Sequence, residues 1–189
     1  MSGRNTLVRS LHDLGLAAWF GGSLMGAVGL NGAARDEGTT DTEAARISSS
    51  GWAKWTPVNA AAIGAHLFGG GALLAVNAHR VNTQKGVAAS TTAKTVVTAA
   101  ALAATAYARV LGKKIELTAS PDPRDAEKAA QHPIDTEKAQ RHLACVQWAV
   151  PVLTGGLVVL NALHGEQQRP FEQLHGMWQH ARAVTPLIP

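Results

Sequence analysis

The feature that most constrains this chain is the absence of charge from four long stretches of its sequence. They are Leu14–Ala34, Trp55–Ala78, Thr95–Ala108 and Leu143–Leu163. Three of them hold the roughly 20 mostly apolar residues that a helix needs to cross a bilayer. The third becomes long enough if Lys94 and Arg109 at its ends extend their side chains towards the headgroups. Because a backbone in lipid must pair its polar groups internally, each stretch is expected to be helical.

The sequence therefore predicts an all-α fold, a bundle of four transmembrane helices that occupies residues 1–166. The expected helices cover about residues 7–32, 57–77, 94–112 and 143–163. Polar loops are expected at residues 35–54 and 113–141, and the second loop holds a possible short surface helix at 123–131. We expect a multi-pass protein of the cell inner membrane, with the lipid bilayer as its first partner.

Bulk composition leaves a second class of protein open. Hydrophobic residues make up 46% of the chain and mean hydropathy is close to zero, as in soluble domains. A soluble, Ala-rich helical bundle is therefore an alternative. Helices of such a bundle place charges on an outward face every three or four residues, however. No such face exists between Leu14 and Ala34 or between Leu143 and Leu163.

The formal net charge of +4 does not indicate nucleic acid as a partner. The basic residues are scattered, and no basic stripe with interleaved aromatic residues is present. Attraction to anionic lipid explains the charge better. Cys145 is the only cysteine, so the chain can form no internal disulfide. Arg4, Arg9 and the following apolar run resemble a signal peptide, but the length of the run favours a retained first helix over a cleaved one.

The last part of the chain, residues 167–189, has the pattern of an amphipathic helix. Phe171, Leu174, Trp178 and Ala181 recur at steps of three and four residues. This spacing predicts a helix that lies in the membrane interface. The alternative is a helix packed on a partner protein.

Glycines indicate where helices pack closely. Gly22 and Gly26 are separated by three residues, and Phe68-Gly69-Gly70 repeats the Phe20-Gly21-Gly22 element of the first helix. Small residues at this spacing let helix backbones approach in lipid, where hydrophobicity gives no drive for association. We therefore expect these glycines to lie at helix–helix contacts.

His66 is the clearest candidate for a functional side chain. It falls near the middle of the second expected helix, where an ionisable group is costly and faces the interior of the bundle or a polar partner. It could bind a cofactor, as a ligand of haem or a metal, or relay protons. Alternatively, it is a neutral imidazole bonded to a nearby oxygen, such as the carbonyl that Pro151 leaves unpaired.

A second candidate group is a possible metal site formed by His12, His79 and His164. In an up-down bundle these residues lie at the same end, together with Asp13 and Glu166. Imidazole and carboxylate groups suit a divalent metal. Polar residues also belong at helix ends for solvation alone, and no HxxH or ExxH spacing marks a preformed site.

No catalytic constellation accompanies these histidines. The sequence contains no nucleophile–base motif, phosphate-binding glycine loop or paired carboxylates. The prediction is a non-enzymatic membrane protein, a structural or accessory subunit that packs with itself as a homo-oligomer or with a larger membrane complex. The alternative function is binding of haem or metal through the histidines.

The first helix also resembles part of a known family. The element His12-x-x-Gly15-x-x-x-Trp19-Phe20-Gly21-Gly22 resembles the first helix of copper-resistance-D-like membrane domains. This resemblance implies metal handling, with His12 as the residue concerned. The Ala-rich composition and the element Gly165-Glu-Gln-Gln-Arg-Pro170 are similar to those of small uncharacterised four-helix membrane proteins of actinobacteria, and that similarity implies no activity.

Overall fold

The computed structural model describes residues 5–78 and 85–184, and side chains at 5–78 and 87–163. Within these ranges the chain is all-helical, without strands. The elements are α1 (Thr6–Met25), η1 (Gly26–Leu30), α2 (Asn31–Glu37), α3 (Asp41–Val76), α5 (Lys85–Ala119), α6 (Pro123–Gln131) and α7 (Thr136–Val184). The predicted all-α fold is confirmed.

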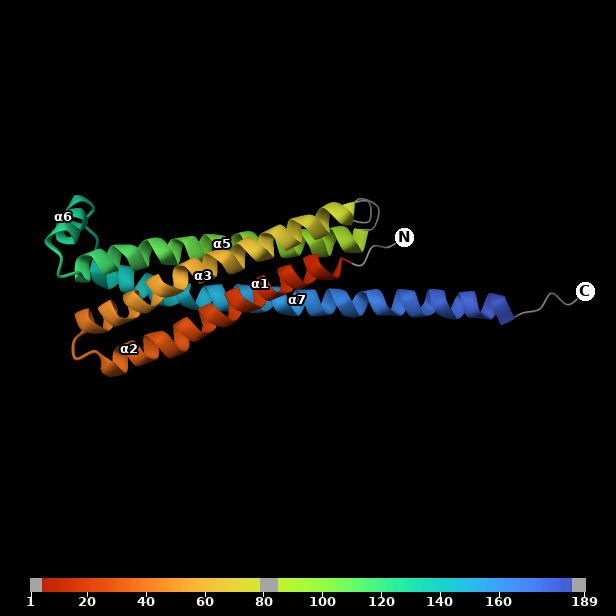
Figure 1. The fold of residues 1–189 in the computed structure, drawn as a ribbon, viewed down its shortest axis with the longest axis horizontal. Helices are drawn as coiled ribbons and strands as arrows, with labels where there is room; N and C mark the ends of the chain where they lie inside the picture. Colours follow the sequence, from red (N-terminus) through yellow and green to blue (C-terminus); the bar gives the residue numbers. More distant parts are fainter. Residues whose placement is uncertain (1–4, 79–84, 185–189) are drawn as a thin grey trace, which may run out of the picture.

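Four long helices form an antiparallel bundle. Helix α1 packs on α3 and α7, and α5 packs on the same two helices. The α2 segment and α6 lie at one end of the bundle, and the N-terminus lies at the other, where α7 continues beyond its neighbours (Figure 1). Four segments are long and apolar enough to cross a membrane: Thr6–Glu37, Asp41–Val76, Val87–Ala119 and Thr136–Leu163. The four predicted apolar helices are therefore present.

The helices are longer than predicted, and the expected polar loop at 35–54 is wrong. Helix α3 begins at Asp41, so most of that region is helical. Thr40 is the N-cap of this early start. The backbone N–H of Glu43 donates to Thr40 Oγ1 over 3.2 Å, which satisfies one donor that the first turn leaves unpaired. Glu43 Oε2 also accepts from the N–H of Thr39, the residue before the N-cap, over 3.1 Å.

The expected loop at 113–141 is also largely helical. Helix α5 continues to Ala119, and α7 begins at Thr136, where Asp135 Oδ1 accepts from the N–H of Lys138. The short surface helix predicted at 123–131 is confirmed as α6, with Asp122 as its N-cap. At the other end of the chain, α7 passes through Gly165 and Pro170 without a break and ends at Val184. The backbone therefore shows no boundary between residues 1–166 and the predicted tail.

A π-helical turn interrupts the first helix. Residues Gly26–Leu30 form this turn, and α2 continues directly from it. Asn31, the first residue after the turn, joins three helices. Its Oδ1 accepts from Ser48 Oγ at 2.8 Å and from Trp52 Nε1 at 2.9 Å, and its Nδ2 donates to Gln147 Oε1 at 2.8 Å.

The central core takes one buried residue from each helix of the bundle. Trp19 of α1, Ala62 of α3, Ala101 of α5 and Val150 of α7 form one cluster. Trp19 is fully buried and donates its Nε1–H to Thr105 Oγ1 over 3.2 Å. We call this cluster, with the partly buried residues packed on it, the central layer.

Glycines set the contact between α1 and α3 in two different ways. The prediction of helix contacts is correct for Gly22, Gly26, Gly69 and Gly70 but wrong for Gly21, where a Cβ would meet nothing within 4 Å. A Cβ on Gly15 would lie 2.5 Å from both the Ala62 carbonyl oxygen and the His66 nitrogen, so the two backbones touch there. Gly22 and Gly26 instead make room for aromatic side chains. The indole of Trp55 covers Gly22, and that of Trp52 covers Gly26.

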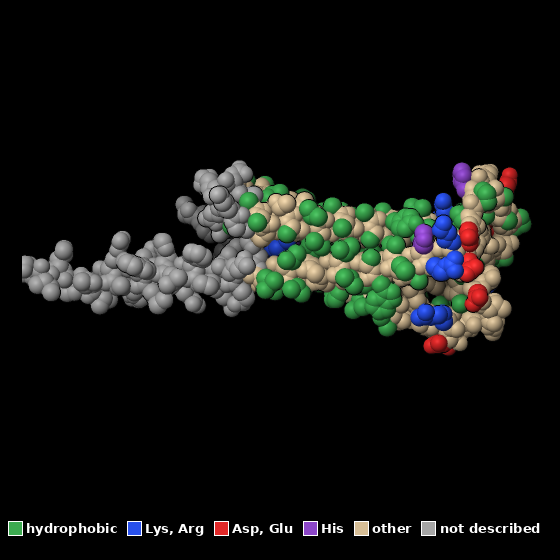
Figure 2. Space-filling view, turned by 180° about the vertical axis from the view of Figure 1, so that it is seen from behind, with side chains coloured by type: hydrophobic (Ala, Val, Ile, Leu, Met, Phe, Trp, Pro, Cys, Tyr) green, Lys and Arg blue, Asp and Glu red, His purple; other side chains and the backbone are tan. Residues whose placement is uncertain are grey.

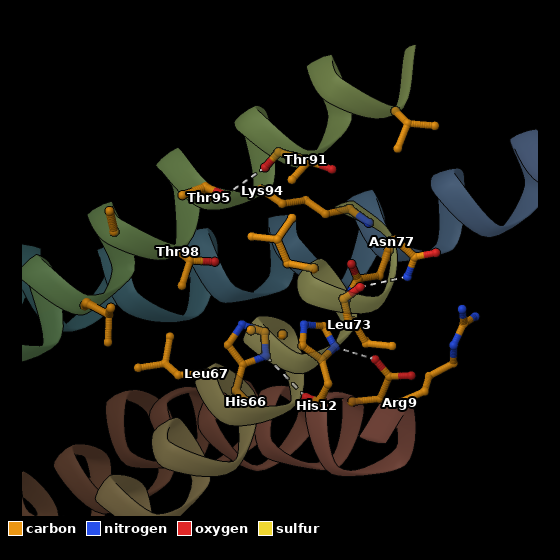
Figure 3. Close-up of a pocket in the computed structure, with 18 residues that line it drawn as sticks. Arg9, His12, His66, Leu67, Leu73, Asn77, Thr91, Lys94, Thr95 and Thr98 are labelled. Atoms are coloured by element: carbon orange, nitrogen blue, oxygen red, sulfur yellow. Dashed lines mark hydrogen bonds and ion pairs between the residues drawn. The ribbon is translucent and has the colours of Figure 1, made fainter. Parts of the chain in front are cut away.

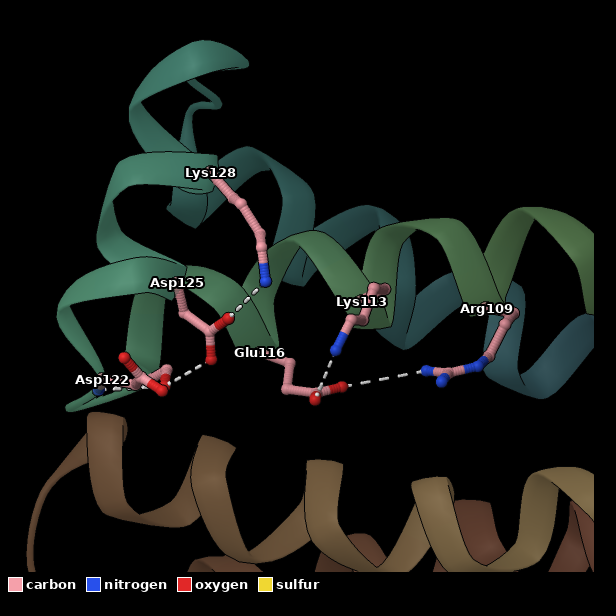
Figure 4. A network of polar contacts seen from close by, with 7 residues as sticks. Arg109, Lys113, Glu116, Asp122, Asp125 and Lys128 are labelled. Atoms are coloured by element: carbon pink, nitrogen blue, oxygen red, sulfur yellow. Dashed lines mark hydrogen bonds and ion pairs between the residues drawn. The ribbon is translucent and has the colours of Figure 1, made fainter.

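Charged and apolar side chains occupy different parts of the surface. Lys, Arg, Asp and Glu gather at the α6 end, and hydrophobic side chains cover the middle of the bundle (Figure 2). At the charged end Lys113 Nζ lies 2.7 Å from Glu116, and Asp125 accepts from Ser120 Oγ at 2.8 Å and from Lys128 at 3.2 Å (Figure 4). The Ser120 hydroxyl, followed by Lys128, holds the pKa of Asp125 below its usual value.

The close approach of α1 and α3 gives a direct test of the packing. We expect Gly15→Ala to lower the free energy of unfolding in detergent by about 1–3 kcal/mol, because rigid backbone of α3 would have to move. Gly64→Ala is the matched control, since a Cβ there meets nothing within 4 Å. Thermal unfolding followed by circular dichroism measures both variants, and equal melting temperatures would contradict the packing.

Candidate functional site

A half-open cavity of about 490 Å³ lies towards the end of the bundle where α1 begins. Helices α1, α3, α5 and α7 all contribute to its wall (Figure 3). We call it the histidine cavity. Its polar lining includes His12, Asp13, His66, Asn77, Lys94 and Asn161.

His66 lies in the wall of this cavity and is only 4% exposed. Its Nδ1 is 3.2 Å from the backbone carbonyl oxygen of His12. A carbonyl oxygen can only accept, so Nδ1 donates, and the neutral ring keeps its lone pair on Nε2. The expected bond from His66 to a backbone carbonyl is thus present, but to His12 rather than to the carbonyl freed by Pro151.

His12 lies directly against His66. The ring centroids are 4.3 Å apart and the planes are tilted by 34°. His12 Nδ1 is 2.8 Å from Asp13 Oδ1, and a carboxylate accepts, so this ring also keeps its lone pair on Nε2 when neutral. The second nitrogen of each ring points into the cavity (Figure 3).

Two glycines bring these histidines together. Gly15 of α1 faces the backbone of His66, and Gly69 of α3 faces His12, where a Cβ would lie 2.7 Å from the His12 nitrogen. Any larger residue at either position would push the helices apart. The sequence placed His66 at mid-membrane and His12 at the interface, so their contact was not predicted. Gly15 and Gly69 are the features of the sequence that mark where α1 and α3 approach closely enough for the two histidines to meet.

Two members of the predicted metal site fall outside the part of the structure that describes side chains. His79 lies outside the described residues altogether, and of His164 only the backbone, within α7, is described. Among the described side chains, no three His, Cys, Asp or Glu residues are grouped to hold a metal ion.

The residues present do not fit a complete metal or haem site. His12 and His66 supply two imidazole nitrogens, whereas metal sites built by proteins take three or more ligands. Their side-by-side rings cannot ligate opposite faces of one haem. Lys94 and Arg9 also line the cavity, and their charges oppose a divalent cation. These observations concern the described side chains alone, and the predicted site of His12, His79 and His164 stays a prediction.

Lys94 also lines the histidine cavity and is half-buried. Its side chain extends along the cavity, past Thr91 and towards the start of α5, which is the direction expected for a lysine that reaches to the end of its helix (Figure 3). It forms no ion pair with any described residue. Thr91 and Thr98, one turn before and after it on α5, line the same cavity, so one face of α5 carries all three inwards.

A second cavity, of about 340 Å³, lies on the other side of the central layer, towards α6. We call it the tryptophan cavity, because Trp52 and Trp55 line it. Asn59, Arg109 and Glu116 also line it. This half-open cavity was not predicted, since its polar residues are far apart along the chain.

Comparison with known proteins does not assign the chain to a family. No protein-family model matches it, and neither does any curated protein or solved structure. Conclusions about its function therefore depend on the geometry described above.

The bond from His66 to α1 can be tested by substitution. We expect His66→Leu to lower the free energy of unfolding by about 1 kcal/mol, the usual net value of one such hydrogen bond. His142→Leu is the control, because His142 is exposed and contacts only Tyr107 among described polar groups. Chemical unfolding in detergent measures both. A His66 variant as stable as wild type would show that the bond contributes nothing.

Proposed function

We propose that this chain is a non-enzymatic, multi-pass protein of the cell inner membrane, a structural or accessory subunit. The observation that carries the proposal is the apolar outer surface of the bundle. Phe68 is 69% exposed, Val152 69% and Val96 63%, and these residues lie on α3, α7 and α5. A soluble bundle would place charged residues at such positions.

Helix length supports the same proposal. The hydrocarbon core of a bilayer is about 30 Å thick, which about 20 helical residues cross. The four candidate spans are 28 to 36 residues long, so they cross it and emerge. The end that emerges at α6 carries the charged residues (Figure 2). A lipid layer around the apolar middle and water around the charged end satisfy both surfaces.

The extension of α7 supports a role in assembly. This helix continues to Val184, beyond the other three helices of the bundle (Figure 1). Phe171, Leu174 and Trp178 repeat on one face of its sequence. A protruding helix with an apolar face suits a contact with the membrane surface, with a second copy or with another membrane protein. We propose that the protein joins its partner through this face.

Membrane insertion is tested by extraction. We expect the full-length chain to stay in the membrane pellet after an alkaline carbonate wash and to dissolve in mild detergent. Its exposed apolar side chains would otherwise meet water. Immunoblotting of pellet and supernatant measures this. Intact chain in the carbonate supernatant would contradict the proposal and favour the soluble bundle.

Assembly through α7 is tested by a pair of substitutions. We expect Trp178→Lys to reduce chemical crosslinking of the chain to its partner or to a second copy in membranes, by on the order of tenfold if Trp178 is an interface anchor. Gln179→Lys, on another face of the same helix, should leave crosslinking unchanged. Equal crosslinking of both variants would argue against this face as the contact.

A further inference from the structure

One face of α5 lines both cavities of the bundle. Its polar members recur at steps of three, four or seven residues, the spacing of a single helix face. They are Thr91, Lys94, Thr98, Thr105, Arg109 and Glu116, and Thr95 lines the histidine cavity beside them. Leu102 stands between Thr98 and Thr105 and is the one described residue that lines both cavities. A polar track thus follows α5, interrupted by one large apolar side chain.

Helix α3 provides the opposite wall over the same length. Its residues from Trp52 to Ile63 line the tryptophan cavity, and those from His66 to Asn77 line the histidine cavity. The 25 residues from Trp52 to Asn77 rise about 37 Å at 1.5 Å each. This distance exceeds the hydrocarbon thickness of about 30 Å. The two cavities together therefore extend across a membrane.

The central layer separates the two cavities. Ile63 and Leu102 pack against Trp19, Ala62, Ala101 and Val150, one apolar level of the bundle. His66 lies three residues from Ile63, and Thr105 lies three residues from Leu102, so polar side chains begin about one helical turn from the layer on each side. A thin apolar constriction between two polar cavities is a typical barrier to hydrated solutes.

The charges along the track favour an anion. The histidine cavity is lined by two cationic side chains, Arg9 and Lys94, and by one anionic side chain, Asp13, which accepts a hydrogen bond from His12 at 2.8 Å. Lys94 and Arg9 line the histidine cavity without an ion pair among the described residues. In the tryptophan cavity Glu116 forms ion pairs with Arg109 at 3.9 Å and with Lys113 at 2.7 Å (Figure 4). The excess of unpaired cationic side chains therefore lies in the histidine cavity. Cationic side chains along a path attract anions and repel cations.

We propose that the bundle contains a closed permeation path for a small inorganic anion, with the layer around Leu102 as its barrier. The path runs between α3 and α5, through the histidine cavity and the tryptophan cavity. This inference rests on the proposed membrane insertion and adds a transport function to it. Chloride is the test anion because its entry can be followed with a trapped dye.

The test is chloride flux into vesicles of phosphatidylcholine that contain the full-length protein and a trapped chloride-quenched dye. We expect Leu102→Thr to raise the rate by on the order of tenfold over wild type, because the apolar barrier becomes polar. Val96→Thr is the matched control, the same kind of change on the outer face of α5, where the residue is 63% exposed. It should leave the flux unchanged.

Selectivity is read in the same vesicles. Adding Lys94→Gln to the Leu102→Thr variant should slow chloride entry, and potassium entry should remain at the rate of protein-free vesicles. No increase in chloride flux with Leu102→Thr, or an equal increase with Val96→Thr, would overturn the path. Potassium or protons moving as fast as chloride would overturn its anion character. Protein that does not float with the vesicles would contradict membrane insertion instead.

A second measurement avoids dependence on the folding of the Leu102 variant. In a Cys145→Ser background, single cysteines at Thr98 and Thr105 would be exposed to anionic and cationic methanethiosulfonate reagents in detergent. The path predicts modification at both sites, faster with the anionic reagent, whereas Val96→Cys should show no preference for the anion. A faster reaction with the cationic reagent, or no reaction at either site, would contradict the proposal.

Discussion

The close contact between α1 and α3 is the interaction on which the rest of the structure depends. Apolar helices gain little from association in lipid, because acyl chains are as apolar as their side chains. Contact must therefore come from tight packing and polar bonds. Gly15 lets the helix backbones touch, and Gly69, which has no Cβ, leaves room for His12. This register puts His12 on His66 and sets where the histidine cavity lies.

The sequence predicted the number and character of the helices because those depend on local properties. Uncharged stretches and length identify membrane-crossing helices, and Asp122 followed by Pro123 marks the start of α6. The prediction of a loop at 35–54 was wrong because it was based on the polarity of the segment. It overlooked Thr40, which acts as the N-cap of α3 and accepts from the N–H of Glu43. The meeting of His12 and His66 was not predictable, since it depends on the register between two helices, which no single segment encodes.

The burial of Lys94 depends on how α5 packs against the other helices. At the end of an uncharged stretch, a lysine is expected to extend towards the headgroups. The face it occupies on α5 is the one that Thr91 and Thr98 share, so the side chain is half-buried in the histidine cavity. It nevertheless extends along the cavity towards the start of α5 (Figure 3). A lysine can therefore line a cavity and still reach towards the end of its helix.

The residues of the central layer both pack the four helices together and separate the two cavities. The central layer takes one buried residue from each of the four helices, so within the described chain it ties all of them together. It also separates the two cavities at Leu102. Trp19 belongs to this layer, yet its indole N–H donates to Thr105, which lines the tryptophan cavity. A substitution in this layer is therefore expected to affect both the packing of the four helices and the separation of the two cavities.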